Sequence, residues 1–222
     1  ESDDAQIQSL DVQRISGLGI PGDVYFASGV FGAADATADV NDILQITLGA
    51  RNDAFTINET PESGLVITLG NGNNRIGVRS VVGALTINAG SGNDQILIGS
   101  QAGFWDIGAD DGERPAYLDL SFVDAGVLVC PEADSCEPSV AFINAQGNLN
   151  EIGQSVTINA GGGTDRVSLD DTIDMDGAAG QMTATQVLGL GMGPAGVINY
   201  NGTGDTESLQ INLDAGNNAF EV

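Results

Sequence analysis

Apolar and polar residues alternate in five short segments of the chain, and each segment runs into a turn rich in glycine and in Asn or Asp. These segments span residues 44–49, 65–70, 85–90, 156–161 and 209–214. A second short apolar segment follows each turn, at residues 55–57, 76–78, 96–98, 167–169 and 220–222. Because successive side chains of a β-strand point to opposite faces, alternation of this kind is typical of half-buried strands. The pattern predicts five copies of one strand–turn–strand unit.

Every position that this alternation places on the inner face carries an apolar residue. The four inner columns read Leu44, Leu65, Leu85, Val156 and Leu209; Ile46, Ile67, Ile87, Ile158 and Ile211; Phe55, Ile76, Ile96, Val167 and Phe220; and Ile57, Val78, Ile98, Leu169 and Val222. The outward positions of the first strand are mostly Thr, Asn and Gln, with Val66 as the exception. We therefore expect an all-β protein with a common apolar interior.

The spacing of the first three turns, about 20 residues, favours a parallel β-solenoid with one repeat per rung, similar to a β-helix or β-roll. Stacked rungs would lie about 4.8 Å apart, and Asn52, Asn73 and Asn93 would form a ladder along the stack. An antiparallel β-meander or sandwich of strand-plus-turn units has the same alternation and stays open as an alternative.

No composition break resembles an interdomain linker, so we expect one elongated β-repeat domain over residues 1–222. Residues 1–42 are predicted to hold an atypical N-terminal cap. Residues 101–155 form an excursion with Cys130 and Cys136, which we expect to close a disulfide rather than remain free thiols. Residues 172–208 form a second excursion with a glycine-rich loop.

The charge balance excludes several kinds of chemistry. Asp and Glu total 31 residues, whereas Lys and Arg total 6, and the net charge is −25 without any His. Sites that need His or Lys, such as a Ser-His-Asp triad or a His-zinc site, are therefore excluded. An acidic surface repels nucleic acid and anionic membranes, and no apolar run is long enough to span a bilayer. The Asp-rich composition suits salty water or divalent cations, so we expect an extracellular or cell-surface protein.

Two turns carry a resemblance to a known family. Residues 89–97, AGSGNDQIL, and residues 160–168, AGGGTDRVS, resemble the glycine-rich nonapeptide of RTX (hemolysin-type) calcium-binding β-rolls. Residues 163–171 and 189–213 are similar to repeats of large bacterial cell-surface proteins that are common in planctomycetes and related marine bacteria. The resemblance implies an extracellular repeat protein with Ca²⁺ at its turns. The first glycine of the nonapeptide is alanine in both copies, and the motif returns only about every 20 residues instead of in tandem.

Calcium needs six to eight oxygen ligands, several of them carboxylates. The turn residues Asp53, Asn74, Asp94 and Asp165 are candidate ligands, although Asn and Asp also complete tight turns without any metal. The densest acidic run supplies four further candidates: Asp170, Asp171, Asp174 and Asp176. This run lacks the spacing of an EF-hand, and a solvated acidic turn is the alternative to a calcium loop.

We expect a structural role rather than an enzyme: a subunit or segment of a fibre, adhesin or surface layer, stabilised by Ca²⁺. The last repeat stops at Val222 inside its second strand, so we expect an open β edge. Such an edge either continues into a longer repeat protein or docks head-to-tail onto another copy; a polysaccharide or cell-surface partner is also expected. The alternatives are a polysaccharide-active β-helix enzyme and a flat ice- or glycan-binding face. No catalytic or cofactor-binding residue is predicted.

Overall fold

The described part of the protein consists of strands and turns. The computed structural model describes residues 8–11, 14–16, 24–25, 43–106, 140–143, 146–174, 179–200, 206–216 and 218–222, and none of these is helical. These described residues therefore contain no helix that is long and apolar enough to cross a bilayer. Cys130 and Cys136, and most of the predicted N-terminal cap, lie outside the described residues, so the predictions for them stay predictions.

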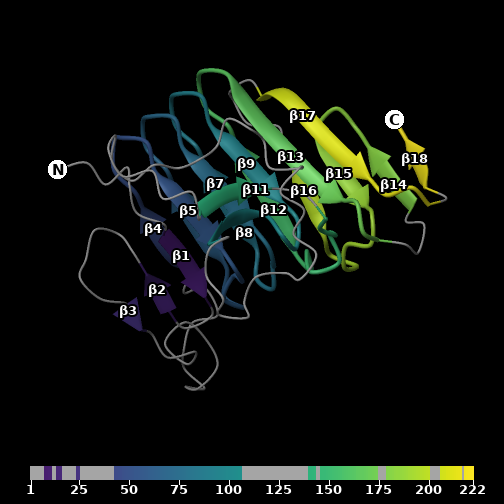
Figure 1. Cartoon of the computed structure of the whole chain (residues 1–222), viewed down its shortest axis with the longest axis horizontal. Coiled ribbons are helices and arrows are strands. Elements are labelled where there is room, and N and C mark those ends of the chain that lie inside the picture. The colour runs from purple at the N-terminus through teal and green to yellow at the C-terminus, as the bar shows by residue number, and fades with distance from the viewer. Residues whose placement is uncertain are drawn as a thin grey trace.

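Two eight-stranded sheets contain most of the strands (Figure 1). Sheet A runs, in spatial order, β3 (Val24–Tyr25), β2 (Arg14–Ser16), β1 (Gln8–Asp11), β5 (Ala54–Ile57), β7 (Arg75–Val78), β9 (Gln95–Ile98), β13 (Asp165–Asp171) and β17 (Thr206–Leu213). Sheet B runs β4 (Leu44–Thr47), β6 (Leu65–Thr68), β8 (Leu85–Asn88), β12 (Ser155–Asn159), β16 (Val197–Asn199), β15 (Gln186–Gly189), β14 (Ala179–Met182) and β18 (Ala219–Glu221). A separate two-stranded antiparallel sheet pairs β10 (Gly103–Asp106) with β11 (Val140–Ile143).

The first four repeats stack in parallel and in register. In sheet B, Ile46 lies opposite Ile67, Ile67 opposite Ile87, and Ile87 opposite Ile158. The second strands of the same repeats, β5, β7, β9 and β13, pair in the same way in sheet A. Each repeat thus contributes one strand to each sheet. This arrangement is consistent with a parallel β-solenoid. The four repeats do not pair as an antiparallel meander, which was the alternative prediction.

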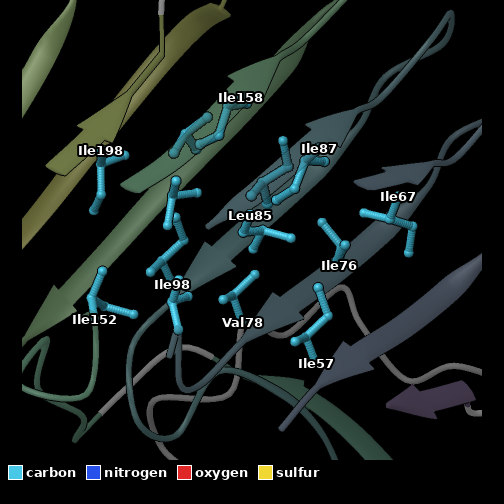
Figure 2. Close-up of a cluster of buried hydrophobic side chains, with 14 of the residues drawn as sticks. Ile57, Ile67, Ile76, Val78, Leu85, Ile87, Ile98, Ile152, Ile158 and Ile198 are labelled. Carbon is cyan, nitrogen blue, oxygen red and sulfur yellow. The ribbon is translucent and has the colours of Figure 1, made fainter. Parts of the chain in front are cut away.

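The core lies between the two sheets, where the predicted inner columns meet. All sixteen inner positions of the first four repeats are buried: those of β5 to β9, β12 and β13 are at most 1% exposed, and Leu44 and Ile46 of β4 are 9% and 7% exposed. Figure 2 shows branched aliphatic side chains from both sheets pointing toward one another, among them Ile67 of sheet B and Ile76 of sheet A. Burying one such side chain contributes roughly 1.5–3 kcal/mol, so these columns are the main stabilising feature of the fold.

The fifth repeat does not continue the columns as predicted. Leu209 and Ile211 belong to β17 and lie opposite Val167 and Leu169 in sheet A, rather than beside Val156 and Ile158 in sheet B. The place next to β12 is taken by β16, which comes from the region predicted as the second excursion. With that edge occupied, the fifth repeat pairs on β13, and its second strand, β18, pairs with β14 in sheet B.

Three strands from residues 172–208 belong to sheet B rather than to a separate loop. Strands β14 and β15 pair antiparallel, and β15 pairs antiparallel with β16. At the end of the chain Phe220 is partly buried, but Val222 is 87% exposed. The prediction that Val222 points into the core is therefore wrong.

The outer faces of the two sheets differ. Strand β10 packs over β5 and β7, and a Cβ added to Gly77 would lie 2.2 Å from the Cα of Gly103. The outward side chains of Thr56, Leu97 and Ser168 in sheet A are at most 9% exposed. In sheet B, by contrast, the outward side chains of β4, β6, β8 and β12 all remain at least partly exposed, and no described strand packs over them as β10 packs over sheet A.

Candidate functional site: the stacked Asn and Asp turns

Glycine allows the turns between β6 and β7, β8 and β9, and β12 and β13 to stack closely. Gly70 and Gly90 take positive φ angles of 86° and 96°, which residues with a Cβ adopt only at a cost. A Cβ added to Gly90 would lie 1.7 Å from the carbonyl oxygen of Gly70 in the neighbouring turn. These glycines therefore have two roles: they take positive φ angles, and the absence of a Cβ lets adjacent turns touch.

An outer ladder of Asn side chains runs along the stacked turns. The backbone N–H of Asn73 donates to Asn52 Oδ1 at 2.7 Å, and that of Asn93 donates to Asn73 Oδ1 at 2.8 Å. The N–H of Thr164 continues the series to Asn93 Oδ1 at 2.9 Å. The predicted ladder of Asn52, Asn73 and Asn93 is confirmed.

An inner ladder runs alongside it in the opposite direction and contains four of the predicted metal ligands. Asp53 N–H donates to Asn74 Oδ1 at 2.8 Å, Asn74 N–H to Asp94 Oδ1 at 2.7 Å, and Asp94 N–H to Asp165 Oδ1 at 2.8 Å. All four side chains are at most 4% exposed. The structure therefore brings Asp53, Asn74, Asp94 and Asp165 together, with a side-chain oxygen of the last three bonded to the backbone of the preceding turn.

Asn and Asp differ in how many of their polar side-chain atoms are hydrogen-bonded in the inner ladder. Asn74 uses its second polar atom as well, because its Nδ2 donates to the carbonyl oxygen of Gly72 at 3.2 Å. The corresponding atom of Asp94, Oδ2, is buried and has no hydrogen-bond partner. Burial raises the pKa of Asp94 to about 6; the N–H of Asn74 opposes this rise and the nearby Asp165 adds to it. An ionised Asp94 is therefore held at a cost in stability.

Asp170, Asp171 and Asp174 form a second acidic cluster at the end of β13. They are 0%, 1% and 9% exposed, so the expectation of a solvated acidic turn is wrong for these three residues. Asp170 and Asp171 are buried because the segment at residues 147–149 folds over them: Asp170 Oδ2 accepts from the N–H of Gly147 at 2.7 Å, and Asp171 Oδ1 from that of Leu149 at 3.3 Å. Asp176 lies outside the described residues.

Burial raises the pKa values of two carboxyl groups in the acidic cluster, those of Asp170 and Asp171. Burial raises the pKa of Asp170, against the opposing hydrogen bonds from Thr172 and Gly147. Burial likewise raises the pKa of Asp171 to about 7, with added repulsion from the charges of Asp174, Asp214 and Asp170. The sequence analysis did not select Asp214 as a candidate residue. Asp214 stands where the first four turns have glycine, and this difference could have identified it.

A threonine that sequence reasoning did not select fixes the corner between β5 and β6. Thr60 is 1% exposed, its Oγ1 donates to the carbonyl oxygen of Gly83 at 2.8 Å, and it accepts from the N–H groups of Val82 and Gly83 at 3.0 Å each. One side chain therefore satisfies three backbone groups of the next repeat. In the sequence Thr60 is part of an Asn-Glu-Thr glycosylation sequon, but that motif does not indicate its role at this corner.

The inner ladder and the acidic cluster have the oxygen chemistry that calcium prefers. At least one side-chain oxygen of Asn74, Asp94, Asp165, Asp170 and Asp171 already accepts a hydrogen bond from a backbone N–H group. Within the residues that the structure describes, no group of three or more acidic or Cys side chains is arranged to hold a metal ion. Calcium binding stays a prediction. Comparison of the chain with protein-family models, curated proteins and solved structures gives no match.

Proposed function

We propose that the chain is an extracellular structural protein: a parallel β-solenoid that serves as a subunit or segment of a fibre, adhesin or surface layer. The observation that carries this proposal is the in-register parallel stacking of the first four repeats, with two hydrogen-bonded ladders along their turns. Stacked repeats of this kind build a rod whose length follows from the number of repeats. The proposal includes no catalytic role.

Head-to-tail association through free strand edges forms part of the proposal. β4 is the last strand of sheet B on one side, and β17 is the last strand of sheet A on the other side. The inward residues of β17, Leu209, Ile211 and Leu213, are only partly buried. A strand edge with unpaired backbone groups is a template for another strand, and a contact that does not close on itself produces a filament.

The high negative charge fits an extracellular setting, where salt and divalent cations screen repulsion between copies. Calcium is proposed to stabilise the stacked turns by neutralising the buried carboxylates of the inner ladder, or those of the Asp170–Asp174 cluster. Because the net charge is −25, this neutralisation would also favour association between copies.

Analytical ultracentrifugation with negative-stain imaging tests the association. The N–H groups of Leu44 in β4 and of Leu48, the residue after this strand, donate to the repeat that contains β6. Because N–H groups alternate in direction along a strand, the N–H of Gln45 points to the free edge. Gln45→Pro removes that donor without removing a bond to β6, whereas Gln45→Thr keeps it. We expect concentration-dependent oligomers for the wild type and Gln45→Thr, and weaker association for Gln45→Pro. A monodisperse wild-type monomer, with and without calcium, refutes the association.

A further inference from the structure

The outer face of sheet B lacks charge in a protein that is otherwise strongly acidic. Seven neighbouring strands of sheet B, in spatial order β4, β6, β8, β12, β16, β15 and β14, contain no Asp, Glu, Lys or Arg within their bounds. The eighth strand, β18, contains one charged residue, Glu221. The net charge of the whole chain is −25. In sheet A, by contrast, charged residues stand within the strands themselves, such as Arg75 in β7 and Arg166 and Asp170 in β13.

Two columns of side chains make up the centre of this surface, which we name the amide–hydroxyl face. Its residues are Gln45, Val66, Thr86 and Thr157 in one column and Thr47, Thr68, Asn88 and Asn159 in the other. Parallel pairing spaces the members of a column by about 4.8 Å. Only Val66 is apolar, so the surface is a regular array of uncharged hydrogen-bonding groups.

Hydrogen bonds along the second column hold its side chains in place. Asn159 Nδ2 donates to Asn88 Oδ1 at 2.8 Å, and Asn88 Nδ2 donates to Thr68 Oγ1 at 3.4 Å. Thr86 and Thr157 lie side by side in the other column. Because these side chains are already ordered, a ligand that binds them loses less conformational entropy than on a flexible surface.

We propose that the amide–hydroxyl face binds a neutral polysaccharide. Sugar hydroxyls both donate and accept hydrogen bonds, which matches the Thr, Asn and Gln side chains. A regular polymer can repeat weak contacts along the columns, so that their combined strength exceeds that of one contact. Anionic polymers are repelled by the rest of the molecule, and two copies facing each other would bring two large negative charges together. The proposal rests on the stacked sheet of the proposed scaffold but not on its self-association.

Affinity gel electrophoresis tests the face with stated probes. The native protein runs in gels containing neutral β-glucan, neutral galactomannan or anionic alginate. Thr86→Glu/Thr157→Glu places two charges at the centre of the face. Thr86→Val/Thr157→Val replaces each hydroxyl group by a methyl group of similar size, and Val66 already stands in that column. The matched control is Ala50→Asp/Gly162→Asp, which adds two charges at equivalent exposed turn positions; a Cβ at Gly162 meets nothing within 4 Å.

We expect a neutral gel to retard the wild type and the turn control equally, with at least a tenfold weaker affinity for the Glu variant and an intermediate affinity for the Val variant. Circular dichroism checks that each variant is folded. Retardation by alginate only, retardation by no gel, or equal retardation of the Glu variant overturns the proposal. Thermal hysteresis without retardation assigns the face to ice and also overturns it. A wild-type monomer that binds glucan refutes head-to-tail association but supports this face.

Discussion

Replacement of Asp94 by Asn is the sharpest test of how the inner ladder works. Asp94 Oδ1 accepts the N–H of Asn74, while Oδ2 is buried without a hydrogen-bond partner. One turn away, Asn74 fills the same position, and its Nδ2 donates a hydrogen bond to the carbonyl oxygen of Gly72. Asp94→Asn keeps the accepted bond, removes a buried charge next to Asp165, and adds a donor where Oδ2 stood.

The magnitude follows from the pKa of Asp94, which burial raises from 3.8 to about 6. Between about pH 4 and pH 6 the folded protein keeps a proton on Asp94 that the unfolded chain has released. Wild-type stability therefore falls as the pH rises through this range. Above pH 6 the ionised carboxylate costs about 3 kcal/mol relative to acidic solution. Asp94→Asn removes this cost and should raise the midpoint of thermal unfolding by about 2–4 °C per kcal/mol.

The assay is urea or thermal unfolding of wild type and Asp94→Asn at a series of pH values from 4 to 8, in the absence of divalent cations. We expect nearly equal stability at pH 4 and a growing advantage of the variant up to pH 7. The reverse substitution, Asn74→Asp, inserts a carboxylate between two others and should destabilise most at high pH. A variant that is no more stable at pH 8, or a difference that does not change with pH, refutes this account of the ladder.

Three further predictions test other features of the stack. Gly90→Ala should cost about 3 kcal/mol or more, because φ is positive and the Cβ would meet the carbonyl of Gly70, whereas Gly162→Ala should be nearly neutral in the same urea titration. Thr60→Val should cost about 1–3 kcal/mol, since three backbone groups lose their partner; an unchanged unfolding midpoint contradicts this. Calcium at pH 8 should raise the unfolding temperature of the wild type, and a chelator should reverse this rise. The rise should be smaller in Asp94→Asn if calcium binds at the inner ladder. No shift in the wild type refutes the calcium prediction.

Alternation of residue types was sufficient to predict the strands of the first four repeats and their inner columns. Leu65, Ile67 and their equivalents are apolar because they face the core, and the outward threonines are polar because water reaches them. The spacing of about 20 residues favoured parallel stacking of the first three repeats but left an antiparallel meander open, so the parallel pairing itself comes from the structure. The ladder of Asn52, Asn73 and Asn93 followed from this stacking.

The remaining differences come from contacts distant in sequence. Leu209 has the same local pattern as Val156, but its place depends on β16, which already occupies the edge of β12. A solvated acidic turn was one of the two predictions for Asp170 and Asp171, yet residues 147–149 bury both side chains. The alternation of residues within a strand does not depend on which distant segment covers that strand. Neither result could therefore be predicted from the sequence.

The central claim is that the first four repeats stack in parallel and in register around one apolar core. Methyl-resolved nuclear Overhauser spectroscopy on the whole chain tests it most directly. The account predicts a continuous series of contacts from Ile46 to Ile67, Ile67 to Ile87, and Ile87 to Ile158. Contacts that instead join strands in antiparallel order, or rapid solvent exchange of the amides of these isoleucines, would contradict it.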